Sequence, residues 1–289
     1  MKKLIHFLRD ITPFKKYLFL LIKHLGKPSP SIYQHLYFNG IFKVNVEDKY
    51  FYMRHNETGI ENITFWEGIE NGWEKVSMKL WIELCKDATC IVDVGAHIGL
   101  YTLVAKTINE NATVHSFEPI ERIYNKLTEN LELNNFQVHH ARIALSDKDG
   151  VAYINDTDGE ALSLDCSLNY NEESSNSGLI QIQTNKLSTI IEKQNMQRID
   201  VMKIDVEGHE VQLLDGMGNY LKSYKPTMII EIVDENNGKQ IFEMIKDCNY
   251  LFFNIDEIHP PRLVKEITKS DKYNFLLCNE NVAKKLNLI

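Results

Sequence analysis

The stretch that decides the fold is Cys90-Ile-Val-Asp-Val-Gly-Ala-His-Ile-Gly99, in which a short apolar run ends at a glycine turn. A helical pattern through residues 100–108 follows it. Further apolar runs alternate with helical patterns along the chain, namely TVHSFEP, VHHARIAL, VMKIDVEG, TMIIEIV and YLFFNID. This alternation predicts an α/β fold, with a mostly parallel sheet covered by helices on both faces. The last run, YNFLLCN, has no helical pattern before it, so we expect it to pair antiparallel near the sheet edge.

Three segments of different character divide the chain. Residues 1–30 form a basic amphipathic leader, residues 31–89 form a cap or lead-in, and residues 90–289 carry the alternating pattern. Apolar residues at helical spacing on both sides of Pro13 predict two short helices in the leader. In the lead-in, to which we assign no chemistry, we expect two strands and an amphipathic helix, near residues 42–46, 50–53 and 74–85.

The formal charge of −8 is unevenly distributed. Residues 1–27 hold seven Lys or Arg and one acid, whereas residues 28–289 hold 25 basic and 39 acidic residues, a net charge of −14. A body this acidic repels phosphate backbones, so we expect no nucleic-acid partner. The leader suggests a peripheral membrane contact through residues 1–27, because a basic amphipathic helix can lie on an anionic surface. The commoner alternative is that its apolar stripe packs on this protein or on a second copy.

Cysteine usage and hydropathy restrict the compartment. The five cysteines are an odd number without CxxC spacing, which favours a reducing, cytoplasmic environment over a disulfide framework or a zinc site. The most apolar stretch, residues 17–22, is far shorter than the roughly 20 residues that a membrane crossing needs. The leader lacks a small-residue cleavage site, so we do not interpret it as a secretory signal. The sequence indicates no oligomeric state.

Candidate ligand-binding residues follow the first two strands, at the edge where open α/β sheets bind ligands. Gly95 permits a tight turn, and Gly99 lets the next helix approach closely and present free N–H groups. Glu118 follows Gly95 by 23 residues, where an acid can accept hydrogen bonds from both ribose hydroxyls. The turn lacks the middle glycine of GxGxxG, so a ligand without a pyrophosphate, such as S-adenosylmethionine, fits better than a dinucleotide.

The fourth strand leads into Lys203-Ile-Asp-Val-Glu-Gly-His-Glu210. Strand alternation places Asp205 and Glu207 on the same side, and Gly208 turns the chain into the next helix. The two acids can hold an ammonium group, orient a hydroxyl or take its proton. Asp205 is the first choice for the base and His209 the second, although a histidine here can also serve only as a cap or a packing residue.

These motifs resemble the FkbM family of S-adenosylmethionine-dependent methyltransferases. The resemblance covers roughly residues 74–280 and rests on IVDVGAHIGLYTL, HSFEP, LELNN, DVMKIDVEGHEVQLLDG and IIEIV, in this order. It implies a class I Rossmann-like fold, typically seven strands with the last one antiparallel. It also implies O-methylation of a hydroxyl, often on a sugar or a polyketide, and therefore a small-molecule or glycan acceptor.

The resemblance assigns site residues by matching position. Asp93, Gly95 and Gly99 would line the cofactor turn, Glu118 would bind the ribose, and Asp205, Glu207 and Glu231 would face the reaction. To the cofactor side we also assign His97, Tyr101 and Pro119. The family commonly has Asn where this chain has His97. An imidazole can donate and accept like an amide, so we expect cofactor binding to survive.

Other interpretations stay open. A divalent metal could use Asp205, Glu207 and His209, but no second cluster has metal-ligand spacing, so we expect no metal. Nucleic-acid N-methyltransferases carry Asn-Pro-Pro or Asp-Pro-Pro at the fourth strand, whereas the double proline here is at 260–261. The chain could also be a catalytically silent ligand binder or scaffold, against which the intact acids argue. We expect the loops at 151–178 and 257–272 to select the acceptor.

Overall fold

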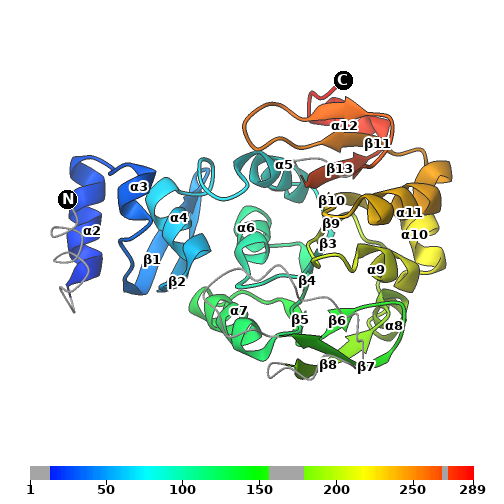
Figure 1. Cartoon of the computed structure of the whole chain (residues 1–289), viewed down its shortest axis with the longest axis horizontal. Coiled ribbons are helices and arrows are strands. Elements are labelled where there is room, and N and C mark those ends of the chain that lie inside the picture. Colours follow the sequence, from blue (N-terminus) through cyan, green and yellow to red (C-terminus); the bar gives the residue numbers. More distant parts are fainter. Residues whose placement is uncertain (1–13, 156–178, 269–272) are drawn as a thin grey trace.

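An eight-stranded sheet with helices on both faces forms the centre of the molecule (Figure 1). The computed structural model describes residues 14–155, 179–268 and 273–289. Five neighbouring strands, from β10 to β5, are parallel, which confirms the predicted α/β class. In spatial order the strands are β12 (Arg262–Val264), β11 (Leu251–Asn254), β13 (Asn274–Cys278), β10 (Thr227–Glu231), β9 (Val201–Ile204), β3 (Cys90–Val94), β4 (Thr113–Phe117) and β5 (His139–Ala141).

The central strands are apolar because both faces of the sheet are covered. Successive side chains alternate between two cores, so that Ile91 and Ile229 pack on one face, and Val92 and Met202 on the other. The first core includes α5 (Lys75–Cys85), α6 (Leu100–Ile108), α7 (Glu121–Leu133) and α12 (Glu280–Lys285). The second includes α8 (Leu187–Lys193), α9 (Glu210–Gly216), α10 (Asn219–Tyr224), α11 (Glu235–Ile245) and η1 (Lys246–Cys248).

The strand order reverses between β3 and β9. Strands β4 and β5 continue from β3 to one side, whereas β9 and β10 lie on the other. Ligands of open α/β sheets bind at the carboxyl ends of the strands beside such a reversal. The segments that follow β3, β4, β9 and β10 therefore surround the expected site.

The last strand, β13, is antiparallel to its neighbours, as predicted, and is third from one edge of the sheet. It lies between β10 and β11. All of its residues are buried, and a strand that is buried on both faces belongs inside a sheet. The edge is the short strand β12, with Arg262 and Leu263 exposed, as is typical of sheet edges.

The run predicted as one strand at VHHARIAL splits in two. Its first part is β5, and its second part, β6 (Ala144–Leu145), joins a separate sheet with β7 (Gly150–Asn155) and β8 (Leu179–Asn185). The predicted loop at 151–178 thus begins within β7, and residues 156–178 lie outside the described residues. Residues 269–272 of the second predicted loop lie outside them too.

The lead-in shares one core with the sheet. It consists of α3 (Pro30–Tyr33), the antiparallel pair β1 (Asn39–Val46) and β2 (Lys49–Asn56), α4 (Gly59–Glu67) and α5, which includes the predicted strand pair and helix. Two contacts join it to distant sequence. The Glu257 carboxylate accepts a hydrogen bond from Val76 N at 2.6 Å, and the Glu74 carboxylate accepts one from Asn274 Nδ2 at 2.9 Å.

The leader contributes α2 (Lys15–Leu25), at the end of the molecule away from the large sheet (Figure 1). The other predicted leader helix lies outside the described residues. Phe19 fixes α2 in place, since it is fully buried with its ring centroid 6.3 Å from Phe38 and 5.8 Å from Trp66. Among the described residues, no helix has the length and hydropathy that a bilayer crossing requires.

Candidate active site

The glycine turn after β3 brings two strand ends into direct contact. Gly95 has a φ of +73°, and a Cβ at this position would lie 1.7 Å from the backbone oxygen of Asp205. Gly95 N and Ala96 N both donate to Phe117 O at 3.0 Å, which fixes the turn against β4. Gly99 has a φ of +89° and begins α6, where a Cβ would lie 2.5 Å from Leu127 Cδ1 of α7. Both positions therefore require glycine on steric grounds.

Glu118 is held by two backbone N–H groups. One carboxylate oxygen accepts from His97 N at 3.0 Å and the other from Ile120 N at 2.9 Å. The side chain is only 5% exposed, and this burial raises the pKa of Glu118 to about 7. The carboxylate therefore ties the turn after β3 to the segment after β4, in addition to any contact with a ligand.

His97 in the turn and Asp93 in β3 differ in hydrogen bonding. His97 has a φ of +50°, and burial lowers its pKa to about 4, so that the ring is neutral at pH 7. Its Nδ1 is buried and has no hydrogen-bond partner among the described residues. Asp93 accepts a hydrogen bond from Thr102 Oγ1, and burial raises the pKa of Asp93 to about 6.

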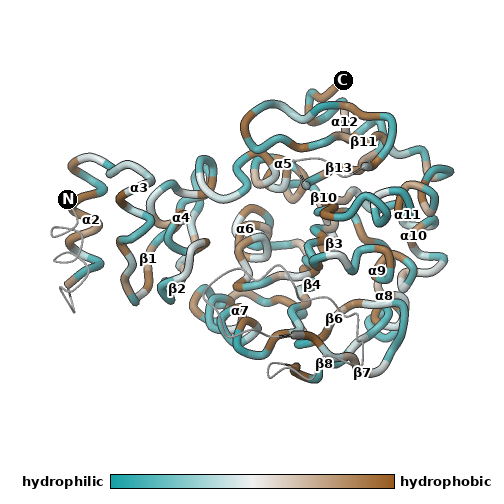
Figure 2. Tube along the Cα trace, viewed as in Figure 1, coloured by the Kyte–Doolittle hydropathy of each residue, from teal (hydrophilic) through white to brown (hydrophobic). Residues whose placement is uncertain are grey.

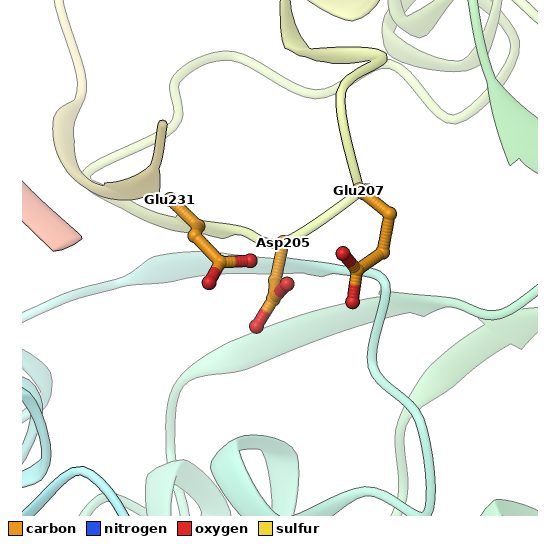
Figure 3. A group of neighbouring side chains, drawn as sticks. All are labelled: Asp205, Glu207 and Glu231. Atoms are coloured by element: carbon orange, nitrogen blue, oxygen red, sulfur yellow. The ribbon is translucent and has the colours of Figure 1, made fainter. Parts of the chain in front are cut away.

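Three carboxyl groups converge at the ends of β9 and β10 (Figure 3). They belong to Asp205, Glu207 and Glu231, and one oxygen of each lies within 4.8 Å of the others. Glu207 occupies the left-handed region, with a φ of +51°. These are the three residues that the family resemblance placed at the reaction, and their oxygens are also suitable ligands for a divalent cation.

The charges in this cluster are unequal. Burial works against ionisation of Asp205, but the Lys203 ammonium at 3.0 Å and a hydrogen bond with Glu231 hold its pKa below the ordinary value. Burial and the charge of Asp205 raise the pKa of Glu231 well above its ordinary value. At neutral pH, Asp205 is therefore ionised, and Glu231 is protonated and donates to it.

Lys203 is the functional residue that the sequence analysis missed. It is 1% exposed, and although burial works to lower its pKa, the carboxylates of Asp205, Glu74 and Glu231 raise it above the ordinary value. Its Nζ lies 5.1 Å from the centroid of the Tyr101 ring. A lysine inside the apolar strand VMKI was the signal that could have revealed it, because a buried ammonium needs a counter-charge.

The lead-in also reaches the site, contrary to our expectation that it carries no chemistry. Tyr101 donates its hydroxyl hydrogen bond to Glu74 at 2.6 Å. Trp73 and Glu74 line a small cavity of about 50 Å³, whose wall also includes Ile60, Asp93, Gly95, His97, Tyr101, Lys203 and Asp205. Pro119 lines a second, larger cavity of about 650 Å³, together with Arg122, Asn125, Arg142 and Gln181.

His209 lies apart from the three carboxyl groups. It is the N-cap of α9, and its Nε2 is 2.9 Å from Ser146 Oγ. Burial lowers the pKa of His209 to about 4. Glu210 is 1% exposed and accepts hydrogen bonds from Gly208 N and Asn237 Nδ2, so it braces the loop. The potential metal ligands that lie together in the structure are therefore Asp205, Glu207 and Glu231, and His209 of the predicted group is not among them.

Comparison with known proteins gives consistent results. Residues 93–252, more than half of the chain, match the methyltransferase FkbM domain. The hexuronic acid methyltransferase AglP of Haloferax volcanii is 28% identical over 175 residues, which cover 61% of this chain and 69% of that protein. Methyltransferase 1 of Beauveria bassiana is 24% identical over 183 residues, covering 56% of this chain and 74% of that protein.

Among solved structures, the FkbM methyltransferase of Methylobacillus flagellatus aligns with a TM-score of 0.42 and 13% identity, over 66% of this chain and 44% of that chain. The domain match lies on the segments that surround the described site, from Asp93 at the end of β3 to Phe252 in β11. The chain belongs to the FkbM methyltransferase family and is an S-adenosylmethionine-dependent methyltransferase.

Proposed function

We propose that this methyltransferase acts on a hydroxyl oxygen and that Asp205 receives the hydroxyl proton. The observation that carries the proposal is the position of the Asp205 carboxylate, 3.0 Å from the buried ammonium of Lys203 and with an oxygen within 4.8 Å of oxygens of Glu207 and Glu231. The Asp205 side chain keeps 31% of its surface exposed, so a substrate can reach it. The lowered pKa makes Asp205 a weak base, but a fixed and accessible carboxylate can orient the hydroxyl and take its proton once methyl transfer makes that proton acidic.

The residues around the glycine turn fit S-adenosylmethionine. Glu118 uses one lone pair of each oxygen for a backbone N–H and keeps the others for ribose hydroxyls. The acids Glu74 and Asp93 at the small cavity suit an ammonium group, and the unpaired Nδ1 of His97 can bind a further polar group of the ligand. When bound, the cofactor supplies a methyl group that its sulfonium charge makes electrophilic.

The chain's own residues position the acceptor and move one proton. Holding two reactants in line can supply roughly 7 to 11 kcal/mol of the barrier reduction, whereas a general base contributes roughly 10² to 10⁴ in rate. Asp205 takes the hydroxyl proton, Glu231 donates a hydrogen bond to Asp205, and Glu207 orients the acceptor from the other side. Lys203 keeps Asp205 ionised while the acceptor is bound.

For the acceptor we propose a sugar hydroxyl. The support is the relative named as a hexuronic acid methyltransferase, which shares 28% identity with this chain. The carboxyl oxygens of Asp205, Glu207 and Glu231 can also accept hydrogen bonds from the hydroxyls of a sugar. We expect the reaction to proceed in the presence of a metal chelator, because Lys203 already supplies a positive charge beside Asp205.

The test is an acceptor screen with methyl-labelled cofactor. The panel pairs hexuronic acid glycosides and neutral hexosides with the matched 2-amino-2-deoxy hexosides, and mass spectrometry locates the new methyl group. We expect a methyl ether on a hydroxyl of at least one sugar. Methylation restricted to the amino sugars would overturn O-methylation, and cofactor binding without turnover on any acceptor would favour a silent binder.

A further inference from the structure

The outer side of α2 is apolar and exposed, unlike its inner side. Phe14, Tyr17, Leu21 and Leu25 follow one another at spacings of three and four residues, which places them on one helix face. They are 64%, 67%, 54% and 77% exposed, whereas Phe19 on the inner face is fully buried. Figure 2 shows the apolar residues of α2 at the end of the molecule farthest from the sheet.

The charge around this face is positive. Residues 14–27 contain four lysines and no acid, in a protein whose residues 28–289 carry a net charge of −14. Lys27 forms an ion pair with Glu67 and Lys23 donates to the Phe65 backbone oxygen, so among the described residues the unpaired charge on α2 comes from Lys15 and Lys16. The chain therefore concentrates basic charge at the same end as its exposed apolar side chains. An exposed apolar face beside basic side chains brings no advantage to an acidic protein that contacts only water.

We propose that this face of α2 docks on the surface of an anionic lipid bilayer. The helix of 11 residues is about 16 Å long at 1.5 Å per residue, so it would lie in the interface rather than cross the roughly 30 Å hydrocarbon core. The apolar side chains would enter the headgroup boundary, and Lys15 and Lys16 would contact anionic headgroups.

Charge favours an anionic bilayer over two other occupants of this face, namely a second copy of the chain and residues 1–13. A second copy docked face to face would bring the lysines of two α2 helices together. Residues 1–13 have three basic residues and one acid, so packing them on α2 would also add positive charge to positive charge. An anionic bilayer complements all of these residues at once.

The experiment is sedimentation of the full chain with vesicles of phosphatidylcholine alone or mixed with phosphatidylglycerol. We expect pelleting with the anionic vesicles only, weakened by high salt because the charges are exposed. Leu21→Ser with Leu25→Ser should lower the partition coefficient about tenfold. The matched control is Val151→Ser with Leu263→Ser, two apolar residues that are each 52% exposed and far from α2, and it should bind as the wild type does. All of these residues are exposed, so equal melting temperatures will verify the fold.

Three results would overturn the proposal. One is equal pelleting with both vesicle types or with neither, and another is wild-type binding by the Leu21→Ser, Leu25→Ser variant. The third concerns a Tyr17→Cys variant labelled with an environment-sensitive dye. Emission that is blue-shifted in buffer and unchanged by anionic vesicles would mean that residues 1–13 or a second copy already cover the face, and sedimentation velocity would tell these two apart.

Discussion

The carboxyl ends of β3 and β4 and the carboxyl ends of β9 and β10 both present acidic side chains, but they hold them differently. Glu118, after β4, is fixed by the backbone N–H groups of His97 and Ile120. Asp205 and Glu231 are fixed by each other and by Lys203. Backbone donors do not titrate, whereas side-chain partners do. The first region is thus suited to holding a ligand in a fixed place and the second to moving a proton.

The largest effect should come from breaking the contact between the two regions. Gly95→Ala places a Cβ 1.7 Å from the backbone oxygen of Asp205, at a φ of +73°, so we expect a loss of more than about 4 kcal/mol in unfolding free energy. The control is Gly208→Ala, with a φ of +96° and no atom within 4 Å, which should cost about 1 to 2 kcal/mol. Urea unfolding measures both, and equal losses would contradict the close approach.

A second variant separates proton transfer from binding. Asp205→Asn cannot take a proton at neutral pH, so we expect turnover to fall by about 10² to 10⁴. Cofactor affinity, measured by calorimetry, should change far less, because the ribose contact is assigned to the other region. Asp215→Asn, an exposed acid on α9, is the control and should keep full turnover. Normal turnover in Asp205→Asn would remove Asp205 as the base.

A substitution at Glu118 is expected to weaken cofactor binding. Glu118→Gln replaces one acceptor oxygen by an NH₂ group and leaves one buried backbone N–H unpaired, so stability should fall by about 1 to 3 kcal/mol. Cofactor affinity should fall about tenfold to a hundredfold. In the wild type, affinity should rise as the pH passes about 7, because the ionised Glu118 is the better acceptor. Unchanged affinity in Glu118→Gln, against Glu129→Gln on α7 as control, would refute the ribose assignment.

The last variant tests Glu231, whose effect on stability depends on pH. Its folded-state pKa is raised, so the unfolded chain releases a proton that the folded protein keeps, and this group lowers stability as the pH rises above the ordinary carboxyl pKa of 4.5. Glu231→Gln mimics the protonated form and removes this loss. Unfolding free energies between about pH 5 and pH 8 should therefore diverge from the wild type with increasing pH. Parallel curves, such as we expect for the exposed Glu243→Gln, would contradict a raised pKa.

Much of this arrangement follows from the sequence. The alternating apolar runs predicted the parallel strands, and the residues after them predicted that Gly95, Glu118 and Asp205 meet at one sheet edge. The exact position of β13 could not be predicted, because the order of strands depends on which distant strands pair, and YNFLLCN has the same pattern inside a sheet as beside its edge.

The contribution of the lead-in to the site could not be predicted from the sequence, for a related reason. Glu74 reaches Tyr101 and Asn274 through contacts that span 27 and 200 residues, and no local spacing marks them. The ion pair of Lys203 and Asp205 was easier to predict from the sequence, since the two are only two residues apart. The protonation of Glu231 depends on their combined burial and charge, which only the folded arrangement defines.

The contacts of Glu74 with Asn274 and of Val76 with Glu257 have a consequence for the order of assembly on the ribosome. The lead-in is synthesised first, but these contacts cannot form until the chain has been made almost to its end. The wall at Trp73 and Glu74 therefore gains these two contacts late in synthesis, whereas the contact of Glu74 with Tyr101 can form earlier.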